Sequence, residues 1–431
     1  MKSDGTGELG ASGGRSDDRP RGKISPMNET GTDGVPTASR RSFLAAAGVT
    51  AAAAALAGCT TADPGLPAAS GPARPAAPDA GVPAGTAAPI PLPAGTPVPA
   101  TGDRQAGVTT PQPPQPHLLI IVYDLNSAPG PLLAVLGDEI IALTAGSAPA
   151  TAGIDPGDLT VTVGVGPSLV AAVGPDLPGA TTLPSFAREQ LADRSDGGDL
   201  MVQICATDPL LLPLVAAAIA ASGGTDLVER WRQRGFRGPY VPIDATVAAP
   251  RNVLGFVDGI VGPHTEAQWD ADVWLTAPPA VAGGTIAVIR RMRIDVDAFH
   301  RLSVAAQESV VGRERATSAP LSGGTAASEP DLGAKTPDGR YRIPVDAHVR
   351  RAHSLAAGVP MMLRRSYSTD DPAAGLLFVS FQDDLQTFTR TMARLDAADA
   401  LLDFTTTTAT GAFLVLPGFG PATPLGATVF G

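Results

Sequence analysis

The sequence predicts an α+β fold built from two similar halves, and two observations support this prediction. From residue 117 onward, short apolar stretches typical of strands alternate with longer stretches that have helical periodicity. The same rhythm occurs twice, once in residues 117–245 and again in residues 246–431. Strands and helices mixed within each half favour an α+β body over an all-α or an all-β one.

The individual elements follow from apolar runs, alternation and proline positions. In the first half we expect strands at His117–Asp124, Leu159–Gly164 and Leu200–Ala206, and helices at Leu132–Leu143, which Pro131 opens, and Leu210–Ala221. In the second half we expect strands at Thr285–Ile294, Leu376–Phe381 and Ala412–Leu416, and helices at Ala305–Val311 and Leu385–Leu395.

Charge and cysteine usage restrict the function further. The formal net charge is -11 and lysine occurs only as Lys2, Lys23 and Lys335. A chain with this balance lacks the basic surface that phosphate backbones require, so we expect no nucleic-acid partner. The two cysteines, Cys59 and Cys205, are far apart in the sequence. Cys205 lies in an apolar stretch and is expected to be a buried free thiol, not half of a disulfide.

The first 59 residues have the pattern of an export signal. A polar stretch, residues 1–38, precedes Arg40 and Arg41, and an Ala-rich apolar run of about 16 residues follows, shorter than the ~20 that span a bilayer. Twin arginines before such a run predict a twin-arginine signal, with a buried Ala-rich helix as the alternative. The run ends in Leu-Ala-Gly-Cys, which resembles a lipobox and makes Cys59 the expected lipid-anchored N-terminus. Met27 offers an alternative start.

Residues 60–116 are dominated by Pro, Ala, Gly and Thr. This composition favours extended polyproline conformations and supplies few side chains for a core. We therefore expect residues 60–116 to be a linker between the anchor and a folded body that begins at residue 117.

Four segments contain the candidate catalytic and ligand-binding residues. They are RNVLGFVDG (Arg251–Gly259), YRIPVDAHVRRAH (Tyr341–His353), MMLRRSY (Met361–Tyr367) and LLFVSFQDDL (Leu376–Leu385). Each has an ordinary structural interpretation: an Asp-Gly pair is usually a turn, and an isolated histidine or arginine is usually structural. His348 and His353 are five residues apart, so they do not share one helical face well enough to chelate a metal.

In this order, the four segments resemble the dye-decolourising peroxidases, most of all the exported branch that includes deferrochelatase/peroxidases. The resemblance covers roughly residues 115–425 and extends to GGDLMVQICATDP, RWRQRGF, AAQESVVGRERATSAPL and GAFLVLPGFG. It implies two ferredoxin-like halves that form a dimeric α+β barrel-like body, with a b-type haem in the second half.

The resemblance also assigns roles to residues. It makes His348 the proximal ligand of the haem iron, Asp258 the distal carboxylate and Arg364 the distal arginine. Asp384 matches the carboxylate that hydrogen-bonds the proximal imidazole, with Asp383 as the alternative.

Gly255 and Gly259 lie in the family's cofactor-binding Gly-x-x-Asp-Gly motif. The sequence departs from that motif after Gly259, where Ile260, Val261, Gly262 and Pro263 replace the usual Thr-x-Asn-Pro. The departure falls in the loop that the resemblance assigns to haem-edge or propionate contacts.

The expected function is peroxidation, in which H2O2 oxidises the haem and a small-molecule reductant restores it. The alternatives are a deferrochelatase or iron-supply protein with the same site, and a non-catalytic haem-binding lipoprotein, which would need neither Asp258 nor Arg364. The sequence leaves the reductant and the oligomeric state open. The aromatic residues Tyr341, Tyr367, Trp269 and Trp274 fit core packing better than electron relay.

Overall fold

The structure is a computed structural model that describes residues 95–243 and 248–431. In these residues, nine strands form one antiparallel sheet in the order β7-β11-β2-β3-β1-β4-β9-β10-β8, and a further pairing between β7 and β10 closes it into a barrel. The strands are β1 His117–Leu125, β2 Thr160–Val165, β3 Leu200–Ala206, β4 Leu227–Phe236, β7 Thr285–Ile294, β8 Leu363–Arg364, β9 Tyr367–Thr369, β10 Gly375–Gln382 and β11 Thr405–Val415. A separate pair consists of β5 Val241–Pro242 and β6 Ala248–Ala249.

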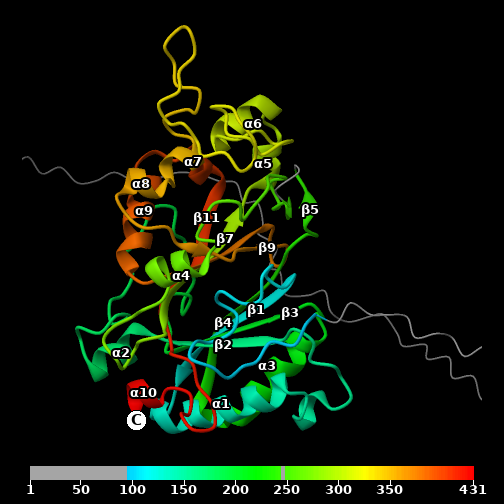
Figure 1. Cartoon of the computed structure of the whole chain (residues 1–431), viewed down its shortest axis with the longest axis vertical. Coiled ribbons are helices and arrows are strands. Elements are labelled where there is room, and N and C mark those ends of the chain that lie inside the picture. The colour runs from blue at the N-terminus through cyan, green and yellow to red at the C-terminus, as the bar shows by residue number, and fades with distance from the viewer. Residues whose placement is uncertain (1–94, 244–247) are drawn as a thin grey trace, which may run out of the picture. The chain divides into compact units, whose positions relative to one another are not determined.

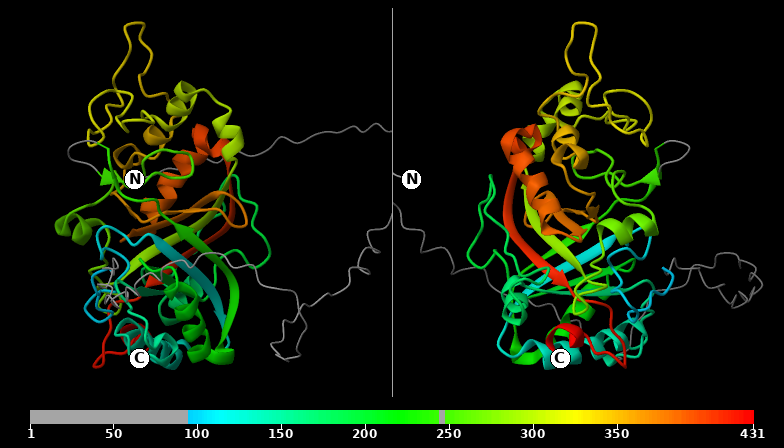
Figure 2. Two further views of the ribbon diagram at one scale, coloured as in Figure 1. Left: turned by 90° about the vertical axis from the view of Figure 1, so that its right-hand side faces the viewer. Right: turned by 60° about the vertical axis from the view of Figure 1, so that its left-hand side comes forward.

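Helices flank the barrel on two opposite sides, as Figures 1 and 2 show. The helices are α1 Pro129–Thr144, α2 Pro167–Val173, α3 Leu211–Gly223, α4 Glu266–Asp272, α5 Val296–His300, α6 Val304–Val311, α7 His348–Arg351, α8 Ser354–Ala357, α9 Leu385–Ala398 and α10 Ala427–Phe430, with 3-10 turns η1 Pro149–Thr151, η2 Gly224–Asp226 and η3 Ala400–Phe404. In Figure 1, α1 and α3 lie below the strands, whereas α5 to α9 lie above them.

The two halves have the same strand order, which confirms the predicted pair of ferredoxin-like halves. In the N-terminal half the sheet order is β2-β3-β1-β4, and in the C-terminal half it is β9-β10-β7-β11. The short strand β8 pairs with β10 on the same edge as β9. Numbered within each half, both orders are 2-3-1-4. The predicted boundary at residues 245 and 246 lies outside the described residues.

The halves join through equivalent strands at both seams of the barrel. The fourth strand of the C-terminal half, β11, pairs with the second strand of the N-terminal half, β2, through Leu414↔Val165 and Val415↔Gly164. At the other seam β4 pairs with β9 through Phe236↔Ser368. Both seams are short, so the barrel also depends on its shared apolar interior. That interior includes Met201, Cys205, Trp231, Trp274, Tyr367 and Phe413.

The expected strands and helices are all present, and most of their ends shift by no more than three residues. The exception is β11, which begins at Thr405 and not at Ala412 because its first part consists of threonines that alternate between the two faces. Strand β4 was not expected, because charged side chains on its solvent face interrupt the apolar pattern. Cys205 lies in β3 and is buried and free, as predicted.

The N-terminal half has a conventional core between its sheet and its helices. Leu133, Leu136 and Ile140 on α1 are fully buried at helical spacing, and burying each contributes about 1.5–3 kcal/mol. The stretch Pro129–Thr151 is also long and apolar enough to cross a membrane by composition, but core helices meet the same criterion. The contact of these side chains with the sheet identifies α1 as a core helix.

Residues 95–116, which we name the strap, correct the prediction of a linker over residues 60–116. The Gln105 amide donates to the carbonyls of Val163 (2.8 Å) and Leu416 (2.9 Å) and accepts from the amide of Val163 (2.8 Å). It therefore fastens the β2–β11 seam. The prediction failed because a few buried amide side chains of the strap bind it to the barrel, and composition does not reveal such contacts. Residues 60–94 lie outside the described residues, as does the predicted export signal with Arg40, Arg41 and Cys59.

Candidate functional site

His348 is the first residue of α7, in the long connection between β7 and β8. Its Nδ1 lies 2.6 Å from Oδ2 of Asp399, whose side chain is fully buried. The other oxygen, Oδ1, accepts a hydrogen bond of 2.9 Å from the amide of Leu401. The Asp399 carboxylate is therefore fixed at both oxygens, and it fixes the imidazole in turn.

Asp399 corrects the prediction that Asp384 or Asp383 would bind the imidazole. Asp384 is the N-cap of α9, and its Oδ1 accepts a 2.9 Å hydrogen bond from Gln386. The amide of Asp383 donates to the carbonyl of Asp272 at 3.1 Å, and burial, with the nearby charges of Asp384 and Asp272, raises the pKa of Asp383. Both residues lie at the start of α9, whereas the carboxylate that reaches His348 follows the end of that helix.

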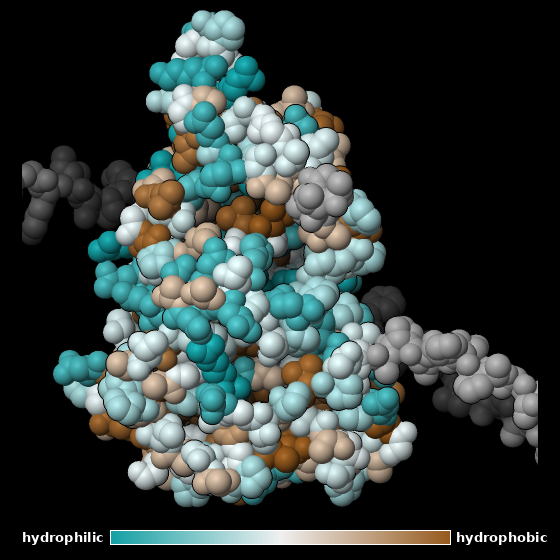
Figure 3. Space-filling view, viewed as in Figure 1, coloured by the Kyte–Doolittle hydropathy of each residue, from teal (hydrophilic) through white to brown (hydrophobic). Residues whose placement is uncertain are grey.

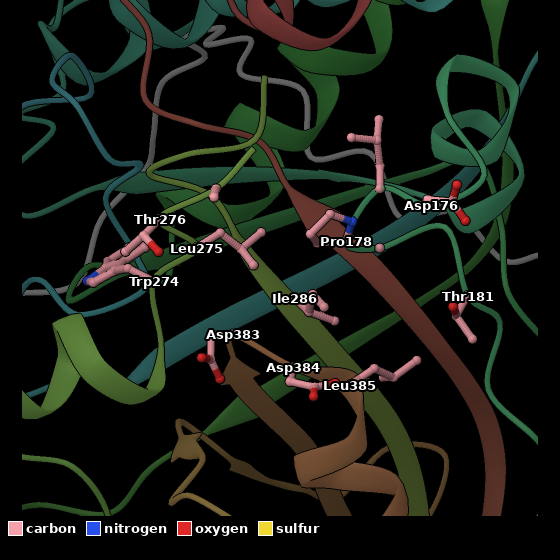
Figure 4. A pocket seen from close by; sticks show the side chains of 13 residues that line it. Asp176, Pro178, Thr181, Trp274, Leu275, Thr276, Ile286, Asp383, Asp384 and Leu385 are labelled. Carbon is pink, nitrogen blue, oxygen red and sulfur yellow. The ribbon is translucent and has the colours of Figure 1, made fainter. Parts of the chain in front are cut away.

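The Asp384 side chain instead lines a pocket of about 430 Å³ formed by both halves. Figure 4 shows Asp383 and Asp384 beside the start of α9, with Asp176 and Thr181 across the pocket. His348, Asp258 and Arg364 are not among the residues that line it. The pocket is thus separate from the predicted site.

The imidazole of His348 is held in a partly accessible position. Burial alone lowers its pKa, but the charge of Asp399 and the hydrogen bond to it outweigh burial, so the pKa is raised. Yet 38% of the side-chain surface is accessible. Within the described residues Nε2 has no hydrogen-bond partner, and the Asp399 contact assigns the proton of a neutral ring to Nδ1. The Nε2 lone pair is then available to a metal.

Arg364 lies on β8, opposite Ser380 of β10. Its Nη2 donates a 2.8 Å hydrogen bond to the carbonyl of Val261. Burial lowers the pKa of the guanidinium, and the carboxylate of Asp258 partly offsets this effect. Val261 belongs to the loop in which the sequence departs from the family motif, so the backbone of that loop holds the arginine although its side chains differ.

Asp258 follows a tight turn whose geometry Asn252 sets. The Oδ1 of Asn252 accepts hydrogen bonds from the amides of Leu254 (3.1 Å) and Phe256 (3.3 Å), and the amide of Asp258 donates to the carbonyl of Pro250 at 3.0 Å. Asp258 is half-buried and lines a small recess with Ser366 and Ser368. Ser366 is two residues from Arg364, and the charge of Asp258 acts on the guanidinium of Arg364.

The two glycines of the motif serve the backbone. Gly255 has φ +82°, and a Cβ there would lie 2.4 Å from Nη2 of Arg315. Gly259 has φ +83° and faces open space. Both positions need the left-handed conformation that glycine adopts without strain. No described contact tests their predicted role in binding a cofactor.

The structure therefore brings together His348, Asp258 and Arg364 and excludes Asp384. The charges of Arg364 and Asp258 both act on His348, the first lowering and the second raising its pKa. In the described residues no hydrogen bond joins these three side chains to one another. Figure 3 shows a hollow with hydrophobic side chains inside it, in the part of the view that Figure 1 labels α7, β7 and β9.

Asp399 is the functional residue that sequence reasoning missed. It is 51 residues from His348 in the chain, and it lies in the run LDAADALLD, where several aspartates look equivalent. The available signal was its position after an amphipathic helix, where an aspartate commonly caps the next turn. It does cap η3, with the same carboxylate that holds His348.

Comparison with known proteins decides the family. Residues 105–237 match the family described as Dyp-type peroxidase, N-terminal, and residues 249–419 match Dyp-type peroxidase, C-terminal. The chain belongs to the Dyp-type peroxidase family. The N-terminal match begins inside the strap, in agreement with the contacts of Gln105.

Relatives in this family carry two different names. The chain is 36% identical over 252 residues to a dye-decolorizing peroxidase of Thermobifida fusca, covering 54% of this chain and 58% of that protein. It is 30% identical over 361 residues to a deferrochelatase of Yersinia pseudotuberculosis, covering 74% of this chain and 82% of the relative. Against the first relative, the match thus spans little more than half of that protein's length.

Solved structures agree with the fold. A ferric DtpA from Streptomyces lividans has a TM-score of 0.71 and 32% identity, covering 78% of this chain and 98% of that one. A DypB variant from Rhodococcus jostii, solved in complex with heme, has a TM-score of 0.55 at 22% identity, covering 72% of this chain and 95% of that one. The more distant likeness shows the fold alone, and its heme is a property of that protein.

Proposed function

We propose that this member of the Dyp-type peroxidase family binds haem b and uses H2O2 to oxidise organic or dye-like reductants. The observation that carries the proposal is the imidazole of His348, fixed at Nδ1 by buried Asp399, with 38% of its side-chain surface accessible and no hydrogen-bond partner at Nε2 among the described residues. A neutral imidazole whose other nitrogen donates to a carboxylate is the usual axial ligand of a haem iron. Haem, when bound, supplies the redox chemistry.

The residues near His348 fit the handling of peroxide. Heterolysis of H2O2 requires one oxygen to lose a proton and the other to gain one. The Asp258 carboxylate can accept that proton and return it to the second oxygen. Arg364, held by the Val261 carbonyl, stabilises the negative charge that develops as the proton leaves. The two groups are close enough for the charge of Asp258 to act on Arg364.

The test compares dye oxidation by the haem-loaded protein with that of two arginine variants. Arg364→Leu should lower the rate of reaction with H2O2 by about 10²–10³-fold, because one charged transition-state stabiliser is removed. The matched control is Arg390→Leu, which removes an exposed arginine of α9 and should leave the rate unchanged. A wild-type protein that binds haem but oxidises no dye would refute the peroxidase proposal and favour a haem-binding lipoprotein.

A second function, removal of iron from haem, is favoured by the deferrochelatase relatives. Peroxidation leaves the haem metallated, whereas deferrochelation releases an iron-free porphyrin with its distinct fluorescence. Incubating the protein with excess haem and measuring porphyrin fluorescence separates the two. The peroxidase proposal expects no accumulation, and stoichiometric or greater porphyrin would support the second function.

We also propose that the protein is exported by the twin-arginine route and anchored by lipid at Cys59. Arg40, Arg41 and the sequence before Cys59 support this proposal. Cys59→Ser should release the protein from the membrane fraction, and Arg40→Lys with Arg41→Lys should retain it in the cytoplasm. Wild-type protein that leaves the membrane in buffer alone would exclude the lipid anchor.

A further inference from the structure

The strap binds the strand segment that carries Arg364, which we name the arginine segment (residues 363–367). The Arg365 guanidinium donates to the carbonyls of Val108 (2.8 Å) and Pro111 (3.2 Å), and to Oε1 of Gln115 (3.3 Å). The hydroxyl of Tyr367 donates to the carbonyl of Gln115 at 2.9 Å. Two side chains of the arginine segment thus bind three residues of the strap.

Arg364 and Arg365 have opposite surroundings. Leu363 and Tyr367 belong to the apolar cluster inside the barrel, and Arg365, which lies between β8 and β9, is also buried, with its guanidinium on the carbonyl of Val108. Arg364 points to the other face, toward Val261. The residue that fills the barrel interior, Arg365, therefore directly follows the residue at the proposed site, Arg364, where β8 ends. Because the two are neighbours in the chain, a shift of the backbone at Arg365 also moves Arg364.

Arg365 is an unusual residue for the interior. It is 2% exposed, and among the described residues no carboxylate pairs with it, so neutral oxygens alone accept its hydrogen bonds. Burial lowers the pKa of its guanidinium. A buried charge without a counter-ion is costly, and an apolar side chain would fill the interior more cheaply. A planar guanidinium, however, presents several N–H donors in a rigid arrangement, so it can fix the positions of several acceptors relative to one another.

The backbone at Arg364 has few restraints of its own, although the end of the arginine segment has others: Tyr367 pairs with Leu377, and Nε of Arg237 donates to the carbonyl of Ser366 at 2.9 Å. Strand β8 consists of two residues, which pair with β10 as Leu363↔Phe381 and Arg364↔Ser380. The amide of Arg365 adds a 2.9 Å hydrogen bond to the carbonyl of Val379. So short a strand contributes little stability of its own. The orientation of Arg364 depends on what holds the neighbouring residues.

We propose that Arg365 is a positioning residue. Its guanidinium, hydrogen-bonded to the strap, fixes the arginine segment so that Arg364 is directed at the proposed peroxide site. The inference rests on the proposed function, because it needs Arg364 to act on an anion there. It gives the strap a second task besides closing the β2–β11 seam. Residues 95–116 become part of the site's support even though none of them is placed at the site.

Fluoride affinity of the ferric, haem-loaded protein tests this proposal without measuring turnover. An anion at the site gains a charged hydrogen bond from a well-placed Arg364, worth about 1.5–3 kcal/mol or roughly 10–150-fold in Kd. Arg364→Leu should therefore weaken fluoride binding by about that factor. Arg365→Met should weaken it by about tenfold, since a misplacement of about 1 Å is costly. Only protein with an intact haem spectrum is titrated.

A matched control is Arg230 of β4 in the N-terminal half. Its guanidinium binds the carbonyls of Asp196 (2.8 Å) and Arg194 (3.2 Å), and the carboxylate of Asp124 (2.7 Å). Arg230→Met removes a comparable fork and should lower stability while leaving the fluoride Kd within twofold of wild type. An equal loss in both variants would mean that Arg365 is only structural, and would overturn the proposal.

Tyr367→Phe is the second variant, in case Arg365→Met does not fold. It removes a single hydrogen bond to the strap and should weaken fluoride binding about threefold, consistent with a loss of about 0.5–1.5 kcal/mol. Wild-type fluoride affinity in folded Tyr367→Phe and Arg365→Met would overturn the positioning role while leaving Arg364 in place. Wild-type affinity in Arg364→Leu would instead remove the distal role of Arg364, and the positioning proposal with it.

Discussion

The two halves of the barrel share one strand order and differ in the connection between their first and second strands. In the N-terminal half, residues 126–159 contain α1 and η1 and pack onto the sheet. In the C-terminal half, residues 295–362 are about twice as long, contain α5 to α8 and carry His348, whose side chain is 38% exposed. Figure 1 shows this longer connection on the side of the barrel opposite α1 and α3.

This difference teaches that one topology can carry connections of different kinds: the long connection supplies His348 to the proposed site, and Asp258 and Arg364 come from other segments of the same half. The N-terminal half fills the space outside its sheet with leucines and isoleucines. The C-terminal half carries the imidazole of His348 in its long connection. Under the proposed function, the same topology serves stability in one half and chemistry in the other.

The largest expected effect concerns the C-terminal half. Asp258→Asn keeps the shape of the side chain but removes its ability to accept a proton. Formation of the first oxidised species should slow by about 10²–10⁴-fold, the usual contribution of a positioned acid or base. Stopped-flow mixing with H2O2 measures this rate. A wild-type rate in the variant would leave Arg364 as the principal group and weaken the assignment of chemistry to this carboxylate.

Substitutions in the N-terminal half should change the free energy of unfolding and leave the rate of reaction with H2O2 unchanged. Leu136→Ala removes a fully buried side chain of α1 and should lower the free energy of unfolding by about 2–5 kcal/mol. Its neighbour Val135 is 50% exposed, so Val135→Ala should change that free energy by less than about 0.5 kcal/mol. Denaturant unfolding measures both. A Leu136→Ala protein that is folded yet slow with H2O2 would show that the halves do not divide the work in this way.

The buried thiol of the N-terminal half gives a pH test. Burial raises the pKa of Cys205 to about 11 from 9.0, so the thiol stays protonated in neutral buffer and becomes reactive only as the pH approaches the raised value. At pH 8 its thiolate fraction should be about 100-fold below that of an unperturbed cysteine. In a Cys59→Ser background, alkylation should be slow in the native state and fast in urea. Rapid native alkylation at pH 8 would contradict the buried position.

The smallest effect compares two aspartates of the C-terminal half. Asp399→Ala should weaken haem binding by about 10–100-fold, as expected when the group behind an axial histidine is removed. Asp384→Ala should leave haem affinity unchanged and cost about 1 kcal/mol of stability through the lost cap of α9. Haem titration and thermal unfolding distinguish these results. The opposite pattern would restore Asp384 as the partner of His348.

Elements that bury a continuous apolar face were predictable from sequence. Strand β3 and helix α3 lie close to where hydrophobic pattern placed them. Elements held by polar contacts were not: β4 alternates charged residues with buried ones, and the strap depends on Gln105 and Gln115. Hydrophobic periodicity in a sequence indicates which residues are buried. It does not reveal a single side-chain amide, such as that of Gln105, that binds two backbone carbonyls.

The candidate site divides in the same way. His348, Asp258 and Arg364 were assigned by resemblance, and the structure brings them together. Asp399 and the carbonyl of Val261 could not be assigned, because each contact joins residues that are distant in the chain. In the second contact the acceptor is also a backbone carbonyl, which any residue could supply. Spacing along a sequence can predict partners within one helix or strand. It cannot predict partners that tertiary folding brings together.

The most direct test of the central claim is the absorption spectrum of the purified protein with haem, compared between His348→Ala and His117→Ala. His117 begins β1, the N-terminal counterpart of the strand before the long connection. We predict that His348→Ala loses most bound haem and the Soret band of histidine-ligated ferric iron, and that His117→Ala retains both. Normal haem binding by His348→Ala would contradict the assignment of the site to the C-terminal half.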